Sequence, residues 1–144
     1  MLFSQASGRK VVSTSTAETV GQIADFVIDP QSHSLVALTV KKTGHGDTLL
    51  WTQITAFGAD AVTVPGADAI IDANDAVAAL AGKDRRLLGK QVLNTAGEDL
   101  GPVEDVDFDP ATGRLVALSL VTGAIAGDRL IGIGSYAAVV HPVS

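Results

Sequence analysis

Carboxylates are the residues of this sequence with the clearest potential for chemistry, and they gather in one short segment. Asp105, Asp107 and Asp109 form a D-x-D-x-D pattern, which can open a calcium-binding loop whose oxygens lie at positions 1, 3 and 5. Such a loop also needs Gly at position 6 and a bidentate Glu at position 12, but Pro110 and Val116 stand there. The spacing therefore does not predict a calcium loop, and we expect neither a metal site nor a cofactor.

The carboxylates around this D-x-D-x-D pattern instead predict an acidic surface. Six carboxylates fall within residues 98–109, and no Lys or Arg lies among them. Such a surface is either simply solvated or steers a basic partner protein toward it. Glu104, Asp105 and Asp107 are therefore candidate partner-binding residues.

Two further catalytic patterns fail on spacing. Residues 132–137, GIGSYA, carry the letters of a dinucleotide-binding turn, but only seven residues follow, too few for the crossover helix and next strand. His33, His45 and His141 lie far apart, and none has a second ligand at metal spacing, so surface or turn positions are expected. We therefore expect a protein that is not an enzyme.

Composition sets outer limits on the class of protein. The 144 residues are 47% hydrophobic, 18% charged and 4% aromatic, with a net charge of −6. The core must then be built from aliphatic side chains, and the acidic charge makes nucleic acid an unfavourable partner. No Cys, no signal peptide and no membrane span are found in the sequence, so a cytoplasmic protein is expected, as a monomer or a homodimer.

A repeat organises the chain. Residues 10–40 placed on residues 90–120 without a gap give eleven identities in 31 positions. Beyond them GDTLLW (46–51) corresponds to GDRLIG (127–132), which pairs Trp51 with Gly132. The repeat predicts two units, residues 1–66 and 84–144, joined by a connector at residues 67–83.

Each unit has the pattern of a small β domain. Val106 and Phe108 alternate with aspartates, as Phe26 and Ile28 do in the first unit, whereas Ile23 has the opposite parity. A β-bulge near residues 24–25 and 104–105 would restore the alternation. A turn follows, DPATGR in one unit and DPQSHS in the other, so that His33 stands where Gly113 can take a positive φ.

The connector contains the one segment with a convincing helical pattern. Val77 and Leu80 share a face with Ala73, and Asn74 or Asp72 can cap the N-terminus. A helix of two turns is too short to be stable alone, so it must pack against a barrel.

The second unit carries a family resemblance. Its LLGKQV opening, the glycine before the strand, and the Asp-Pro-x-x-Gly-Arg turn before the next strand resemble the PRC-barrel family. This family includes the cytoplasmic barrel of the photosynthetic reaction centre H subunit and the C-terminal domain of the ribosome maturation factor RimM. The resemblance implies an all-β fold: two tandem, small antiparallel β-barrels with one short connector helix. From the match between the repeats we expect the two barrels to be related by a pseudo-two-fold axis.

What the resemblance implies about function is docking rather than catalysis. We expect a scaffold that binds another protein, one of basic character being an option; the alternative is a ribosome-maturation factor that binds a ribosomal protein through a RimM-like barrel. Differences between the units point to contact residues. Ile125 lies in a loop of small residues in the second unit, and Trp51 suits either the core or a partner contact.

Overall fold

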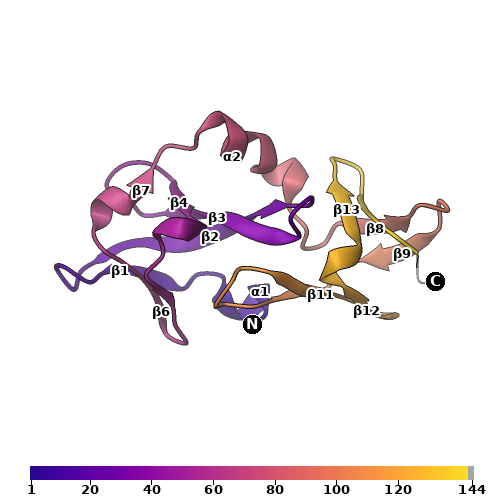
Figure 1. Cartoon of the computed structure of the whole chain (residues 1–144), viewed down its shortest axis with the longest axis horizontal. Helices are drawn as coiled ribbons and strands as arrows, with labels where there is room; N and C mark the ends of the chain where they lie inside the picture. The colour runs from indigo at the N-terminus through magenta and orange to yellow at the C-terminus, as the bar shows by residue number, and fades with distance from the viewer. Residues whose placement is uncertain (143–144) are drawn as a thin grey trace.

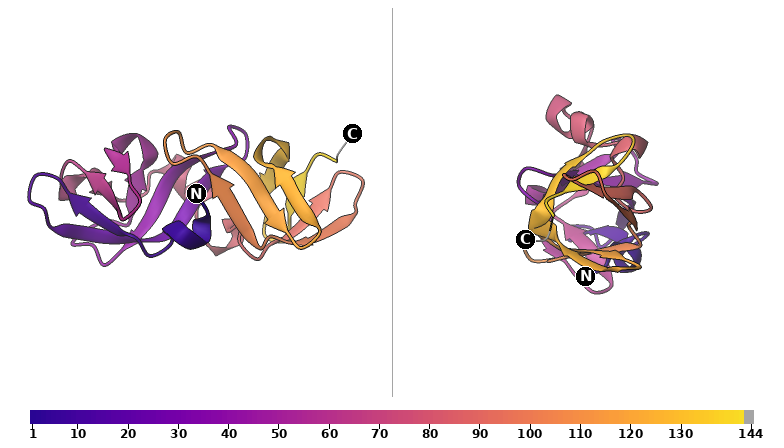
Figure 2. Two further views of the ribbon diagram at one scale, coloured as in Figure 1. Left: turned by 90° about the horizontal axis from the view of Figure 1, so that it is seen from below. Right: turned by 90° about the vertical axis from the view of Figure 1, so that its right-hand side faces the viewer.

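The computed structural model describes residues 1–142, which form two small barrels lying end to end (Figure 1). The first barrel contains the strands β1 (Lys10–Ser13), β2 (Thr19–Asp29), β3 (Ser34–Lys41), β4 (Thr48–Leu50), β5 (Ala56–Phe57), β6 (Ala61–Val64) and β7 (Ile70–Ile71). The second contains β8 (Gln91–Asn94), β9 (Asp99–Pro102), β10 (Asp105–Phe108), β11 (Leu115–Leu120), β12 (Gly123–Ala126), β13 (Leu130–Ile133) and β14 (Ala138–Val140). Seen end-on, the strands surround a common interior (Figure 2).

Short helices connect and flank these strands. The α-helices are α1 (Phe3–Ala6) and α2 (Asp75–Leu80). The 3₁₀ helices are η1 (Trp51–Gln53), η2 (Ala67–Ala69), η3 (Lys83–Arg85) and η4 (Gly127–Arg129). None of the helices within residues 1–142 is long and apolar enough to cross a membrane.

Apart from β7, the two barrels share one strand order. The first sheet runs β5-β6-β1-β2-β3-β4-β7. The second barrel repeats this order as β13-β14-β8-β9 and β10-β11-β12, because the long β2 is represented by β9 and β10, which residues 103–104 separate. The predicted all-β architecture of two tandem barrels is therefore confirmed.

One pairing in each barrel departs from the predicted antiparallel arrangement. β1 pairs with β6 in parallel, and β8 pairs with β14 in the same way. The cause lies in the link between β4 and β5, where η1 continues the chain without reversing it. Four reversals of direction therefore separate β1 from β6, and this even number brings the two strands into a parallel pair.

The structure corrects the alignment of the repeats at two places. Val11 pairs with Gly21 and Val92 pairs with Gly101, so the first hairpin is one residue longer in the first barrel and the match there is not gapless. Leu50 pairs with Ala37 as Ala126 pairs with Ala117, which makes Gly127 the counterpart of Trp51. The predicted correspondence of Trp51 to Gly132 was wrong. The Gly-Asp dipeptide on which it was based precedes β4 in the first barrel but lies in η4 in the second.

Local features of β2 and β10 agree with those predicted from the sequence. The register of β2 shifts between Ile23 and Asp25, as a bulge requires. The carboxylate of Asp25 accepts a hydrogen bond from the N–H of Phe26, and that of Asp105 accepts one from Val106, both at 2.9 Å. In the turn that follows, His33 has φ 54° and its counterpart Gly113 has φ 80°.

Residues of the predicted connector cover the first barrel. β7 pairs with β4 at the edge of the sheet, and α2 lies over the outer face of β2 and β3 (Figure 1). Asn74 caps α2 by accepting a hydrogen bond from the N–H of Val77 at 2.8 Å. The domain limits 1–66, 67–83 and 84–144 remain a prediction. Within the predicted connector, β7 belongs to the first sheet.

The barrels meet through reciprocal contacts. The N–H of Leu35 donates to the carbonyl of Gly113, and the N–H of Leu115 donates to the carbonyl of His33, both at 2.8 Å. Because each bond maps onto the other when the barrels are exchanged, the junction has approximate two-fold symmetry. One hydrophobic cluster runs through both barrels, so they share a continuous core.

Candidate docking groove at the barrel junction

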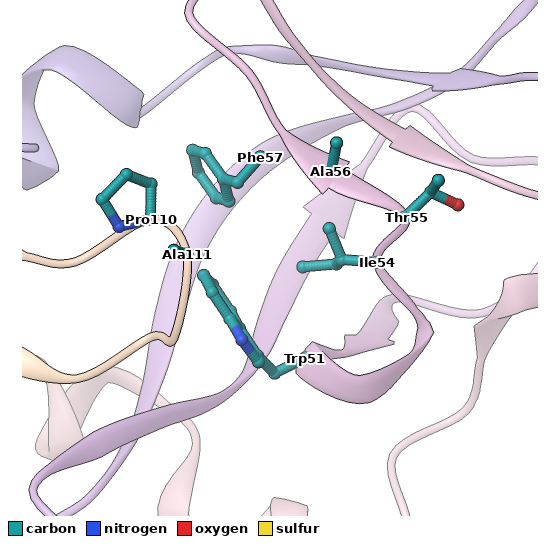
Figure 3. Close-up of a pocket in the computed structure, with 7 residues that line it drawn as sticks. All are labelled: Trp51, Ile54, Thr55, Ala56, Phe57, Pro110 and Ala111. Atoms are coloured by element: carbon teal, nitrogen blue, oxygen red, sulfur yellow. The ribbon is translucent and has the colours of Figure 1, made fainter.

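A groove of about 400 Å³ lies where the two barrels meet, and it contains Trp51 (Figure 3). Its lining comes from both barrels: Trp51, Ile54, Thr55, Ala56, Phe57, Pro110 and Ala111. The first five belong to η1, β5 and the link between them, and the last two to the turn before β11. The groove therefore exists only because the barrels are held together.

Stacked aromatic rings form the floor of this groove. The ring centroids of Trp51 and Phe57 are 5.7 Å apart, and the ring planes are inclined by 22°. Behind them Phe108 presents its ring edge-on, with centroid distances of 6.3 Å to Trp51 and 5.4 Å to Phe57. Phe108 is buried, whereas Trp51 and Phe57 remain half-buried, so apolar area is left for a ligand.

The guanidinium group of Arg9 lies over the ring of Phe57. The guanidinium carbon of Arg9 lies 5.8 Å from the ring centroid of Phe57, a cation–π distance. Arg9 also donates to the carbonyl oxygens of Gly58 at 2.7 Å and Gln5 at 3.1 Å. These bonds fix its position, so the Phe57 ring has a rigid support.

Trp51 depends on a glycine of the other barrel. A Cβ atom placed on Gly113 would lie only 2.8 Å from Cε2 of Trp51 and 3.2 Å from the carbonyl oxygen of Leu35. Glycine at position 113 therefore serves two needs, the positive φ of the turn and the close approach of the indole ring. On the opposite side of the junction, the equivalent positions hold Gly127 and His33, so Trp51 has no symmetric counterpart.

The acidic candidates lie beside the N-terminal segment. Ser4 donates to Asp105 through both its hydroxyl and its N–H, and the amino group of Met1 lies 2.8 Å from Asp107. Glu104 is exposed. Of the three predicted contact residues, Asp105 and Asp107 thus bind within the chain, and Glu104 faces solvent.

The first barrel has an equivalent of this contact. Nε of Arg86 lies 2.5 Å from Oδ2 of Asp25, the counterpart of Asp105. In each barrel this aspartate therefore binds the segment that leads into the other barrel. This position stabilises the junction, and the exposed pair contributes at most about 1 kcal/mol to that stability.

Ile125 lies on β12, and its half-buried side chain packs against the core. It is far from Trp51 in the strand order, since β12 lies at the outer edge of the second barrel. The structure therefore does not unite the predicted contact residues in one site. It separates them into the groove, the junction with its N-terminal segment, and the β12 edge.

Asp99 is the one carboxyl group with a clear shift of pKa. The side chain of Gln91 donates to it, and so does the N–H of Gly101 at 2.8 Å, and these bonds lower the pKa of Asp99 below its usual value. The carboxylate is exposed and the shift has a local structural cause. It gives no indication of acid–base chemistry.

Within residues 1–142, no group of three or more His, Asp or Glu side chains is arranged to hold a metal ion. His33 lies in a turn, and His45 and His141 are exposed.

Sequence reasoning missed most of the groove. Phe57, Pro110 and Ala111 were not candidates, because nothing in their local patterns reveals that the β10–β11 turn faces η1. The usable signal was the difference between the repeats: Trp51, Phe57 and Ala111 correspond to Gly127, Ile133 and Gln31. Correct alignment of the repeats would have placed the three differences together.

Comparison with known proteins gives one result. The model of a family described as the PRC-barrel domain matches the chain twice, at residues 1–77 and 81–141. No curated protein matches the chain.

Proposed function

Since the chain belongs to the PRC-barrel family, we propose that it is a non-enzymatic docking module that binds another protein through the groove at Trp51. The observation that supports the proposal most strongly is the aromatic floor of this groove. Two large rings stay half-buried there, whereas the three other Phe side chains, Phe3, Phe26 and Phe108, are buried.

The composition of the groove suits a protein ligand. Trp is enriched among the residues that contribute most to protein–protein binding, because it buries a large rigid area at a small cost in conformational entropy. Pro110 and Ala111 form the opposite wall, so an apolar side chain of the partner would be enclosed from two sides. The threonine at position 55 adds a polar rim, as interfaces of this kind have.

The acidic surface has a second role in this proposal. Glu104 is free to attract a basic partner, and Asp105 and Asp107 add negative charge beside it even while they bind the N-terminal segment. Such charges raise the association rate more than they strengthen the final complex. Ile125, on a separate edge, is considered below.

A comparative pull-down from native lysate tests the docking groove. The parent chain is compared with Trp51→Ala and with Ala111→Arg, which fills the groove from an exposed position without removing the indole. Tyr136→Ala is the matched control, because Tyr136 is an aromatic residue that is 77% exposed and lies outside the groove. We expect the specifically bound proteins to be lost with both groove variants and kept with the control.

The identity of the captured protein distinguishes a general scaffold from a RimM-like ribosome-maturation factor. Ribosomal proteins lost with the groove variants would favour the RimM-like alternative, whereas another complex would favour a scaffold. Capture that is equal for the parent and both groove variants would contradict the proposed site. Turnover of a substrate that one substitution abolishes would contradict the non-enzymatic role.

A further inference from the structure

The two barrels differ most in what covers their edges and outer faces. In the first barrel a single segment, residues 67–80, does both. β7 pairs with β4, with Leu49 opposite Ile70 and Thr48 opposite Ile71. The chain then enters α2, whose Val77 and Leu80 pack on Val27 and Ala37 of the sheet's outer face.

The second barrel has no counterpart of this segment among residues 1–142, and β12 ends its sheet. Side chains of the second barrel at the equivalent positions are more exposed than those of the first barrel. Leu49 is 0% exposed, but its counterpart Ile125 is only half-buried; Thr48 is buried, but Ala124 is exposed. On the outer face, Val36 is half-buried and Val116 is 51% exposed.

In the first barrel Ile70 fills a buried position: it is 1% exposed and lies opposite Leu49. Within residues 1–142 the counterpart strand β12 has no such neighbour, so this side of β12 is unpaired.

The sequence of the edge strand lacks the residues that usually prevent pairing. β12 reads Gly-Ala-Ile-Ala, without Lys, Pro or any charged residue. An apolar edge of this kind is a ready template for a strand from another chain. Val116 is an exposed apolar residue of the outer face, whereas Ile125 on β12 packs toward the core.

We propose that the second barrel binds a partner protein by strand addition: an extended segment with two branched apolar residues pairs antiparallel with β12, as residues 70–71 pair with β4. The first barrel is the template for this occupant, since it shows which segment the same surface accepts. Main-chain hydrogen bonds to β12 provide the affinity, and a branched side chain at the position of Ile70 lies opposite Ile125, as Ile70 lies opposite Leu49. A short helix after the strand covers Val116. The inference shares with the proposed function the premise of protein binding, but it concerns a different surface.

A peptide taken from the chain itself is the probe. A fluorescent synthetic peptide of residues 66–81 is titrated with the full chain, and binding is followed by fluorescence anisotropy. We expect saturable binding that falls at least about 10-fold when the peptide carries Ile70→Asp, because a charge cannot enter the apolar space. Hydrogen exchange at saturation should slow at the amides of residues 123–126.

Protein variants locate the site independently. Ile125→Lys should weaken binding at least about 10-fold, since lysine on an edge strand opposes pairing. Val116→Lys should weaken peptide binding to a smaller extent. Because Val116 is 51% exposed, this substitution is expected to leave folding intact. Val121→Lys is the control with the same charge, because Val121 is 83% exposed in the turn beside β12, and it should bind like the parent.

The alternatives give different results. Protection of β4 instead of β12 would mean that the peptide only displaces β7, and it would overturn the inference. Dimers that dissociate with Ile125→Lys in sedimentation experiments would identify a second copy as the occupant and would also overturn it. Trp51→Ala should leave peptide binding unchanged, so failure here and failure of the groove can be told apart; no binding of the peptide refutes the strand-addition site alone.

Discussion

The contact between Trp51 and Gly113 joins the two barrels and can be measured by a double-mutant cycle. The substitution is Gly113→Ala, made in the parent chain and in a Trp51→Ala chain. Two separate costs are expected in the parent. A non-glycine residue at φ 80° costs about 1 kcal/mol, and a methyl group 2.8 Å from Cε2 of Trp51 adds about 1–2 kcal/mol of overpacking.

In the Trp51→Ala chain only the cost of the backbone conformation should remain. The tight approach to the carbonyl oxygen of Leu35, at 3.2 Å, persists in both backgrounds and cancels from the comparison. Gly113→Ala is therefore expected to lower the free energy of unfolding by about 2–3 kcal/mol in the parent and by about 1 kcal/mol without the indole. The coupling energy is the difference, about 1–2 kcal/mol.

Urea unfolding followed by circular dichroism is the assay, because Trp51 is the only Trp and its fluorescence is lost in half of the cycle. The two barrels share one core, so a single transition is expected. A cost of Gly113→Ala that agrees within about 0.5 kcal/mol in the two backgrounds would refute the reasoning, since independent sites add to that accuracy.

Two further predictions concern single residues. His33→Gly should raise the free energy of unfolding by up to about 1 kcal/mol, since glycine adopts φ 54° without strain, whereas His33→Ala should give no gain; urea unfolding measures both, and a loss of stability with glycine would contradict the prediction. Glu104→Lys should slow association with a captured partner several-fold at low salt and much less at high salt, with Asp72→Lys on the first barrel as the control. Stopped-flow or surface-plasmon measurements test this, and equal rates for parent and variant would remove Glu104 from the site.

Much of the fold could be predicted from the sequence because each repeat carries strong local signals. The parity change at Ile23 predicted the bulge, and the Asp-Pro turn predicted the reversal into β3. Asn74 and Asp72 were the two caps predicted for the connector helix, and Asn74 is the one that accepts a hydrogen bond from the first turn of α2. These features depend only on residues a few positions apart.

The candidate site was less accessible because it depends on distant contacts. Alignment by letters paired Trp51 with Gly132, and only the ladder between β3 and β4 reveals Gly127 as its counterpart. Likewise, the acidic pattern was visible, but not the donors that Ser4 and Met1 bring to it from about 100 residues away. Periodicity predicts which side chains share a face and contains no information on which segment packs against it.

The reciprocal hydrogen bonds between the turns at His33 and Gly113 have a consequence for stoichiometry. An interface with this two-fold relation is the kind that identical subunits form, and in a homodimer every residue at it would occur twice. A tryptophan facing a glycine would then create two equal grooves, and two partners could bind. Here both halves belong to one chain, so Trp51 occurs on one side and Gly127 on the other. Within residues 1–142 the proposed aromatic groove therefore occurs once, and we expect a complex formed through it to hold one partner per chain.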